Sequence, residues 1–91
     1  QMEKKILEFL KDKPNKYFSL SEIEQAINET EIEFKIRRLI KYKLVKEKIV
    51  SLNRSMFILN FNKQEIYEGL EQMKKDKEDK ILRFIELIKW W

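Results

Sequence analysis

Apolar residues recur every three to four positions at the start of the chain and predict a short amphipathic helix. Met2, Ile6 and Leu10 share one face of this helix. Pro14 interrupts the pattern, so the helix is expected to stop near Asp12.

Two capping signals follow this helix. In the segment YFSLSEIEQAIN, the Ser19 hydroxyl can accept from the Glu22 amide while the Glu22 carboxylate returns to the Ser19 amide. A second helix is therefore predicted after Ser19. Thr30 with Glu33 forms another such pair after a gap of about two residues, which predicts a tight turn into a third helix. This is a helix-turn-helix arrangement.

The third helix has an aliphatic face and a polar face when its residues are spaced about 100° apart. The predicted inward stripe consists of Ile32, Ile36, Leu39 and Ile40. The predicted outward face consists of Phe34, Arg37, Arg38 and Lys41.

The periodicity changes after Val45. The runs KEKIVSL and SMFILNF are rich in residues that favour strands, and Asn53 and Arg54 between them are compatible with a turn. The sequence therefore predicts a β-hairpin with its tip near Asn53.

A last helix is predicted to begin after Asn62, whose side chain can cap it with Glu65 in the third position. Oppositely charged residues four apart within KKDKEDK, such as Lys74 and Glu78, favour one continuous helix over residues 62–91. The same run also fits a solvated linker. The apolar stripe, with Lys77 in its middle, consists of Ile66, Leu70, Met73, Lys77, Ile81, Phe84, Ile88 and Trp91.

A continuous helix of this length would span about 43 Å and project beyond a small domain. Its end, ILRFIELIKWW, is apolar on nearly every side, so it needs a cover, and a second copy is the simplest one. The predicted homodimer interface consists of Ile66, Leu70, Met73, Ile81, Phe84, Ile85, Ile88 and Trp91. Two alternatives stay open: a break within residues 74–80 that folds the helix back onto its own domain as a monomer, and a weaker one in which the helix lies on a membrane surface.

Composition argues against chemistry. The chain has no Cys and no His, which removes thiol and imidazole nucleophiles, disulfides and the common transition-metal ligands. We therefore expect no enzymatic activity, no cofactor and no metal. The longest apolar run, residues 56–59, is far too short to cross a bilayer, and no secretory signal is visible, so a cytoplasmic location is expected.

The net charge of +4 is unevenly distributed. Residues 17–34 carry five acids and no base, whereas residues 35–54 carry eight bases and one acid, Glu47. The positive charge therefore coincides with the third helix and the hairpin, where a nucleic acid could be bound.

The order helix, helix, helix, hairpin, helix, with SLSEIEQAI leading into TEIEFKIRRLIKYKLVKEK, resembles the winged helix-turn-helix superfamily of regulators. The resemblance covers roughly residues 2–61, and its most specific part is RRLIKYKLVKEK, which is similar to the exit of the family's third helix. The family usually has Gly immediately before the Leu-Val pair, where this chain has Lys43. The last helix is similar to the dimerisation helix of repressors of the multiple-antibiotic-resistance and arsenic-repressor types, and to that of small archaeal winged-helix proteins.

This resemblance implies a mainly α fold with a small β-hairpin (α+β), divided into a winged helix-turn-helix domain over residues 1–61 and a dimerisation helix over 62–91. It also implies a homodimeric transcriptional regulator that binds double-stranded DNA. The residues expected to contact DNA are Phe34, Lys35, Arg37, Arg38, Lys41, Lys43, Lys46, Lys48 and Arg54. The alternative is a winged-helix module that binds protein through Phe34 and the acidic second helix, with the basic face solvated.

Overall fold

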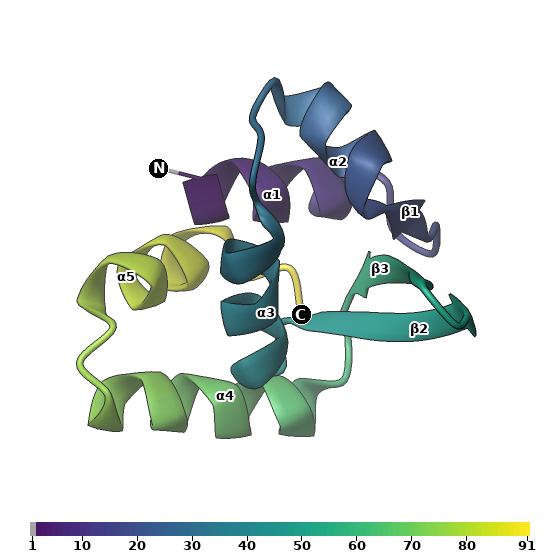
Figure 1. Ribbon diagram of the computed structural model, residues 1–91. Coiled ribbons are helices and arrows are strands. Elements are labelled where there is room, and N and C mark those ends of the chain that lie inside the picture. The colour runs from purple at the N-terminus through teal and green to yellow at the C-terminus, as the bar shows by residue number, and fades with distance from the viewer. Residues whose placement is uncertain (1) are drawn as a thin grey trace.

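The computed structural model describes residues 2–91. Within this range the chain forms five helices and one three-stranded antiparallel sheet, a mixture compatible with the α+β class (Figure 1). In chain order the elements are α1 (Met2–Asp12), β1 (Phe18–Ser19), α2 (Leu20–Ile27), α3 (Glu33–Lys41), β2 (Val45–Ser51), β3 (Arg54–Leu59), α4 (Lys63–Lys75) and α5 (Asp79–Ile88).

Local capping sets the start of two helices as predicted. The Ser19 hydroxyl accepts from the Glu22 amide at 3.1 Å, and the Glu22 carboxylate accepts from the Ser19 amide at 2.8 Å, which completes a capping box at α2. The Asn62 side chain accepts from the Glu65 amide at 3.0 Å and caps α4. Both signals are confirmed because each needs only residues three positions apart.

The predicted capping box at the start of α3 is wrong. Ile32 occupies the N-cap position, and no side chain forms a cap hydrogen bond there. The preceding residue, Glu31, has a left-handed backbone with φ of 57°, and Ile32 is fully buried. Burial of Ile32 therefore anchors this end of α3 in place of a polar cap.

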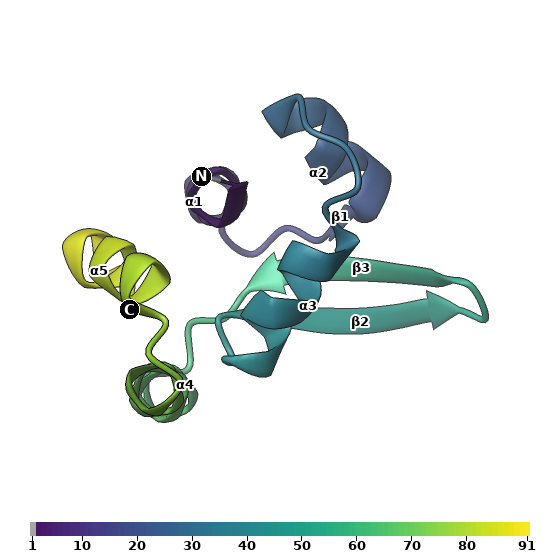
Figure 2. The same cartoon turned by 60° about the vertical axis from the view of Figure 1, so that its left-hand side comes forward.

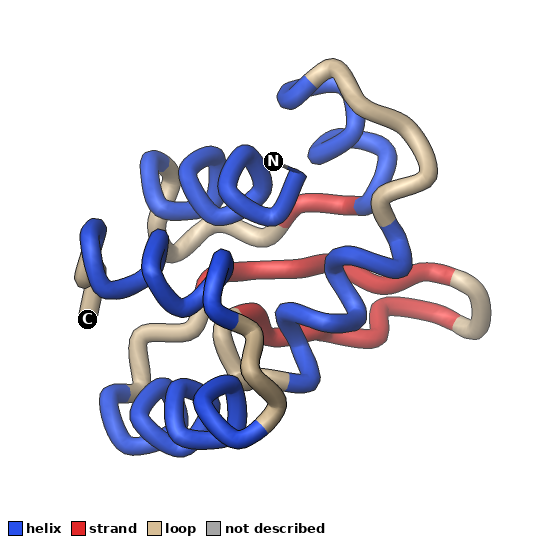
Figure 3. The backbone as a smooth tube through the Cα atoms, turned by 90° about the vertical axis from the view of Figure 1, so that its left-hand side faces the viewer, coloured by secondary structure: helices blue, strands red, loops and turns tan. Residues whose placement is uncertain are grey.

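The predicted hairpin is confirmed as β2 and β3, with its turn at Leu52 and Asn53. The tip of the hairpin extends beyond the helices (Figure 3). The sheet order is β1-β3-β2, because the short strand β1 pairs with β3 through Phe18 opposite Phe57. A strand of two residues has no alternation for the sequence to reveal.

The prediction of one continuous helix over residues 62–91 is wrong. The helix breaks after Lys75, where Lys77 adopts a left-handed backbone with φ of 58° and the Glu78 amide donates to the Met73 carbonyl at 3.0 Å. The turn brings α5 back between α1 and α4 (Figure 2). Folding back buries the apolar face of α5 in the chain's own core. This burial stabilises the broken helix over the continuous one.

The side chains predicted to face a second copy are instead covered within one chain. Fully or almost fully buried among them are Ile66, Leu70, Met73, Ile81, Phe84 and Ile85. Ile88 and Trp91 are partly buried against the same core. This core also includes side chains from α1, α2, α3 and the inner face of the sheet, so residues 2–61 and 62–91 share one hydrophobic cluster.

Helix α4 contacts the end of α3 closely at Gly69. A Cβ at this position would lie 1.7 Å from the carbonyl oxygen of Tyr42 and 2.7 Å from its carbonyl carbon. Glycine lowers helix stability by about 1 kcal/mol relative to alanine. Here it is needed because the helix packs directly on backbone.

Candidate nucleic-acid interface

Helix α3 lies beside the β2–β3 hairpin and has one open side (Figure 2). Phe34 is 69% exposed at the first turn of this side, and Arg37 and Lys41 follow it at helical spacing. The inward stripe predicted for α3 is confirmed: Ile32, Ile36 and Leu39 are fully buried, and Ile40 is partly buried against the same core.

Toward the hairpin, Arg37 is held by two carboxylates. Its guanidinium donates to Glu47 Oε1 on β2 at 2.6 Å and lies 3.7 Å from Glu33 Oε2. The hydrogen bond from Arg37 lowers the pKa of Glu47, and the hydrogen bond to Glu47 raises the pKa of Arg37. The Arg37 guanidinium is therefore positively charged and held in one orientation, and the two carboxylates offset part of its charge.

Arg37 and Arg54 line one shallow cleft between α3, the start of α2 and the hairpin tip. The cleft has a volume of about 370 Å³. Arg54 is exposed and has no ion-pair partner among residues 2–91. We call the surface formed by Phe34, Arg37, Lys41 and Arg54 the α3–hairpin surface.

Lys48 lies on the other face of the hairpin. Glu47 points toward α3, so its neighbour Lys48 points to the opposite face of the sheet, where its Nζ lies 5.4 Å from the centre of the Tyr17 ring. At the hairpin tip, Leu52 is 97% exposed.

On the side of α3 away from the hairpin, two further predicted cations contact acids from other elements. Arg38 forms ion pairs with Glu78, in the α4–α5 turn, and with Glu3 on α1 at 3.5 Å. Lys35 lies 3.3 Å from the same Glu3, which is 4% exposed. Arg38 and Lys35 therefore balance the charge of a buried carboxylate as well as facing solvent.

The end of α3 contacts Asp76, the C-cap residue of α4. The Tyr42 hydroxyl donates to Asp76 Oδ2 at 2.7 Å, and Lys41 Nζ lies 3.7 Å from the same atom. The hydrogen bond from Tyr42 lowers the pKa of Asp76, and burial together with this contact raises the pKa of Tyr42. Tyr42 is 3% exposed and belongs to the hydrophobic core.

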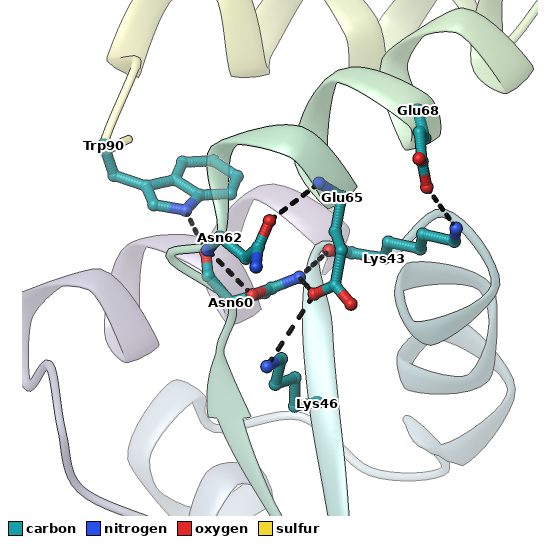
Figure 4. A network of polar contacts seen from close by, with 7 residues as sticks. All are labelled: Lys43, Lys46, Asn60, Asn62, Glu65, Glu68 and Trp90. Carbon is teal, nitrogen blue, oxygen red and sulfur yellow. Dashed lines mark hydrogen bonds and ion pairs between the residues drawn. The ribbon is translucent and has the colours of Figure 1, made fainter.

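Two more predicted cations are drawn toward α4 (Figure 4). Lys43 Nζ donates to Glu68 Oε1 at 2.5 Å, and Lys46 Nζ lies 3.7 Å from Glu65 Oε1. Between them, the buried Asn60 amide donates to the Lys43 carbonyl at 2.8 Å and to Glu65 Oε1 at 3.0 Å. Lys43 and Lys46 are therefore part of the junction between β2 and α4.

The Asn60 junction also holds the chain's last residues. Asn60 Oδ1 accepts from the Asn62 amide at 2.9 Å, and its backbone carbonyl accepts from the Trp90 indole at 2.8 Å (Figure 4). The Trp91 ring packs edge-on against Tyr67 with ring centres 6.3 Å apart. These contacts fix the exit from β3 and the end of α5 together.

The nine residues predicted to contact DNA thus fall into separate groups. Phe34, Arg37, Lys41 and Arg54 share the α3–hairpin surface. Lys35 and Arg38 face α1 and the α4–α5 turn, Lys43 and Lys46 face α4, and Lys48 faces away from α3.

Sequence reasoning missed the acids that pair with this segment. Glu3, Glu78 and Asp76 come from elements far away in the chain, and no local pattern marks them as partners of α3. Asn60 was also missed. Its place between a strand and a helix cap was a usable signal, because a polar residue buried at such a position needs hydrogen-bond partners.

Comparison with protein-family models, with curated proteins and with solved structures finds no match to this chain. Within residues 2–91, no three or more acidic, His or Cys side chains are grouped to hold a metal ion. None of the described helices has the length and apolar character that a bilayer crossing requires.

Proposed function

We propose that the protein is a winged helix-turn-helix regulator that binds double-stranded DNA through its α3–hairpin surface. The observation that carries the proposal is the common cleft of Arg37 and Arg54, one cation from α3 and one from the hairpin tip. In this class of fold, a helix enters the major groove and the hairpin contacts the adjacent backbone. The element order α1, β1, α2, α3, β2, β3 is compatible with that class.

The ion pairs on α3 do not prevent such binding. Exposed pairs contribute about 0–1 kcal/mol each, so Arg37 and Lys41 can exchange Glu47 and Asp76 for phosphate at small cost. Release of counterions from the duplex favours the exchange. The pairs do reduce the net positive potential, so we expect weaker binding than eight free cations would give.

The acids at the start of α3 shape the expected mode of contact. Glu31 and Glu33 are exposed near the first turn and repel phosphates. Glu33 lines the same cleft as Arg37 and Arg54 and lies 3.7 Å from Arg37, so it offsets part of their attraction for phosphate, whereas Lys41 lies one turn beyond Arg37 on α3. Binding is therefore expected to rest on the second half of α3 and on the hairpin, with contacts to the backbone dominating over base readout.

Arg54→Ala tests the proposal most cleanly, because Arg54 has no ion pair within residues 2–91 whose loss would disturb the fold. The affinity of the Arg54→Ala variant for a generic duplex of about 20 base pairs is expected to fall roughly fivefold. The slope of log affinity against log salt should decrease by about 1. Lys11→Ala removes the same charge at an exposed position of α1 and is the matched control. Equal affinities for both variants would exclude Arg54 from the interface.

The second candidate is a protein-binding module. Exposed apolar side chains at Phe34, Ile49 and Leu52, next to cations that are already paired with the chain's own acids, favour this reading. Phe34→Ala would then abolish partner binding. A protein that does not bind duplex at low salt would leave this candidate as the function.

A further inference from the structure

Helix α5 covers the core through one continuous apolar face. Ile81, Phe84 and Ile85 are buried, and α5 contacts both α1 and α4. Beyond this packed face, α5 is connected through the turn at residues 76–78 and through the C-terminal contacts of Trp90 and Trp91. An α5 helix from a second copy of the chain would cover the same surface of α1 and α4 and bury the same side chains.

The turn that folds α5 back contains a disfavoured backbone. Lys77 is exposed and has φ of 58°, a left-handed conformation that only glycine adopts without cost. The turn is three residues long and contains neither Gly nor Pro. Short connections under strain favour the exchange of an element between identical chains.

The sequence across the turn is compatible with a straight helix. Lys74 with Glu78, Lys75 with Asp79, and Asp76 with Lys80 are opposite charges four positions apart, each stabilising in a continuous helix. In the single chain the turn separates these pairs, and Glu78 contacts Arg38 while Asp76 contacts Tyr42. A straight connection would therefore replace the left-handed residue with helical hydrogen bonds and three favourable pairs, in exchange for the contacts of Glu78 with Arg38 and of Asp76 with Tyr42.

We propose that two copies of this chain exchange their α5 helices to form a dimer. In the exchanged dimer, residues 63–88 of each chain form one helix that carries α5 onto the α1–α4 face of the partner copy. Contacts of Ile81, Phe84 and Ile85 are kept, and only the turn differs between the two forms. The monomer–dimer balance is therefore set by the turn residues and by protein concentration.

Two substitutions at position 77 separate the forms with the same loss of charge. Lys77→Gly relieves the left-handed residue and weakens a helix through this position, whereas Lys77→Ala keeps the left-handed cost and favours a helix there. Together the two effects make the equilibrium constant between the bent and the straight connection differ by about 30-fold between the two variants, for each connection. The Ala dimer, which has two turns, should therefore dissociate roughly a thousandfold less readily than the Gly dimer.

The experiment refolds each variant of the full chain at about 1 mM and measures mass by light scattering after chromatography. Because the chain has no Cys, spin labels at Glu71→Cys and Glu86→Cys report on α5 without side reactions. Both positions line one cleft in the single chain, whereas a continuous helix holds them about 22 Å apart. Mixing with excess unlabelled chain restricts the measured distance to pairs within one chain.

A Lys77→Ala dimer with the long distance, beside a Lys77→Gly monomer with the short one, is the expected result. A Lys77→Ala protein that stays monomeric overturns the proposal. A dimer that keeps the short distance also overturns it, because the copies would then associate without exchanging α5.

Discussion

Replacing the only glycine of the chain, Gly69→Ala, tests how α4 is held against α3. In an isolated helix this change would stabilise by about 1 kcal/mol. In this structure the new Cβ would lie 1.7 Å from the Tyr42 carbonyl oxygen, whereas ordinary contacts begin at 3.4 Å. Cβ contacts under 3.0 Å are essentially never seen, so α4 must retreat by at least 1.3 Å (3.0 − 1.7), since backbone cannot rotate away as a side chain can.

The retreat has two costs. Forcing a close-packed contact apart costs about 1–3 kcal/mol, and the hydrogen bond from the Tyr42 hydroxyl to Asp76 contributes about 1 kcal/mol that a shifted α4 loses. After the gain in helix propensity, Gly69→Ala is expected to destabilise the protein by about 2 kcal/mol. For a domain of this size, Tm should fall by roughly 10 °C.

Urea unfolding and a thermal melt followed by circular dichroism measure this effect. Lys75→Ala, at an exposed position of the same helix, is the control and should change the free energy of unfolding by less than about 0.5 kcal/mol. A Gly69→Ala protein as stable as the parent, or more stable, would refute the close approach of α4 to the Tyr42 carbonyl.

Two further predictions concern polar contacts. Asn60→Ala leaves the Lys43 carbonyl without its side-chain donor and should lower the free energy of unfolding by about 2–3 kcal/mol, measured by urea titration; a loss below about 0.5 kcal/mol would contradict the role of Asn60. In the folded chain the pKa of Glu47 lies below its ordinary value of 4.5, and the pKa of Asp76 lies below its ordinary value of 3.8. The two carboxylates therefore stabilise the fold at pH values above those ordinary values, and this stabilisation is lost as the pH falls through the folded pKa. Unfolding at a series of pH values below about 4.5 should show this decline, and Glu47→Gln with Asp76→Asn should flatten it; an unchanged slope would show that these carboxylates are not selectively stabilised by folding.

The parts of the fold that were predictable depend on near neighbours in sequence. The capping box of Ser19 and Glu22, the Asn62 cap and the buried stripe of α3 each require residues within one or two helical turns. The strand β1 was not predictable, because two residues acquire their conformation only by pairing with Phe57 and its neighbour on β3.

The break between α4 and α5 illustrates the limit most clearly. The local charge pairs around Lys77 favour a helix, each by a few tenths of a kcal/mol. Burying Ile81, Phe84 and Ile85 against the core contributes about 1.5–3 kcal/mol for each side chain, which outweighs the local preference. The sequence revealed the apolar face of this helix, but it did not reveal which surface would cover it.

Lys43, at the position where the winged-helix resemblance leads us to expect Gly, has a backbone conformation that suits glycine. Its φ of 62° is left-handed, the conformation for which a glycine is ordinarily used. Here the Asn60 amide holds the Lys43 carbonyl, and Glu68 holds its ammonium group. These partners also explain why a cation expected to contact DNA is directed to α4 instead.

Titration of the full chain against a generic duplex at about 50 and 200 mM salt measures whether the α3–hairpin surface binds DNA. With phosphate contacts from Arg37, Lys41 and Arg54, the affinity should fall about 40-fold per bound chain between the two conditions. Absence of binding at the lower salt, or an affinity that does not change with salt, would refute DNA binding by the α3–hairpin surface.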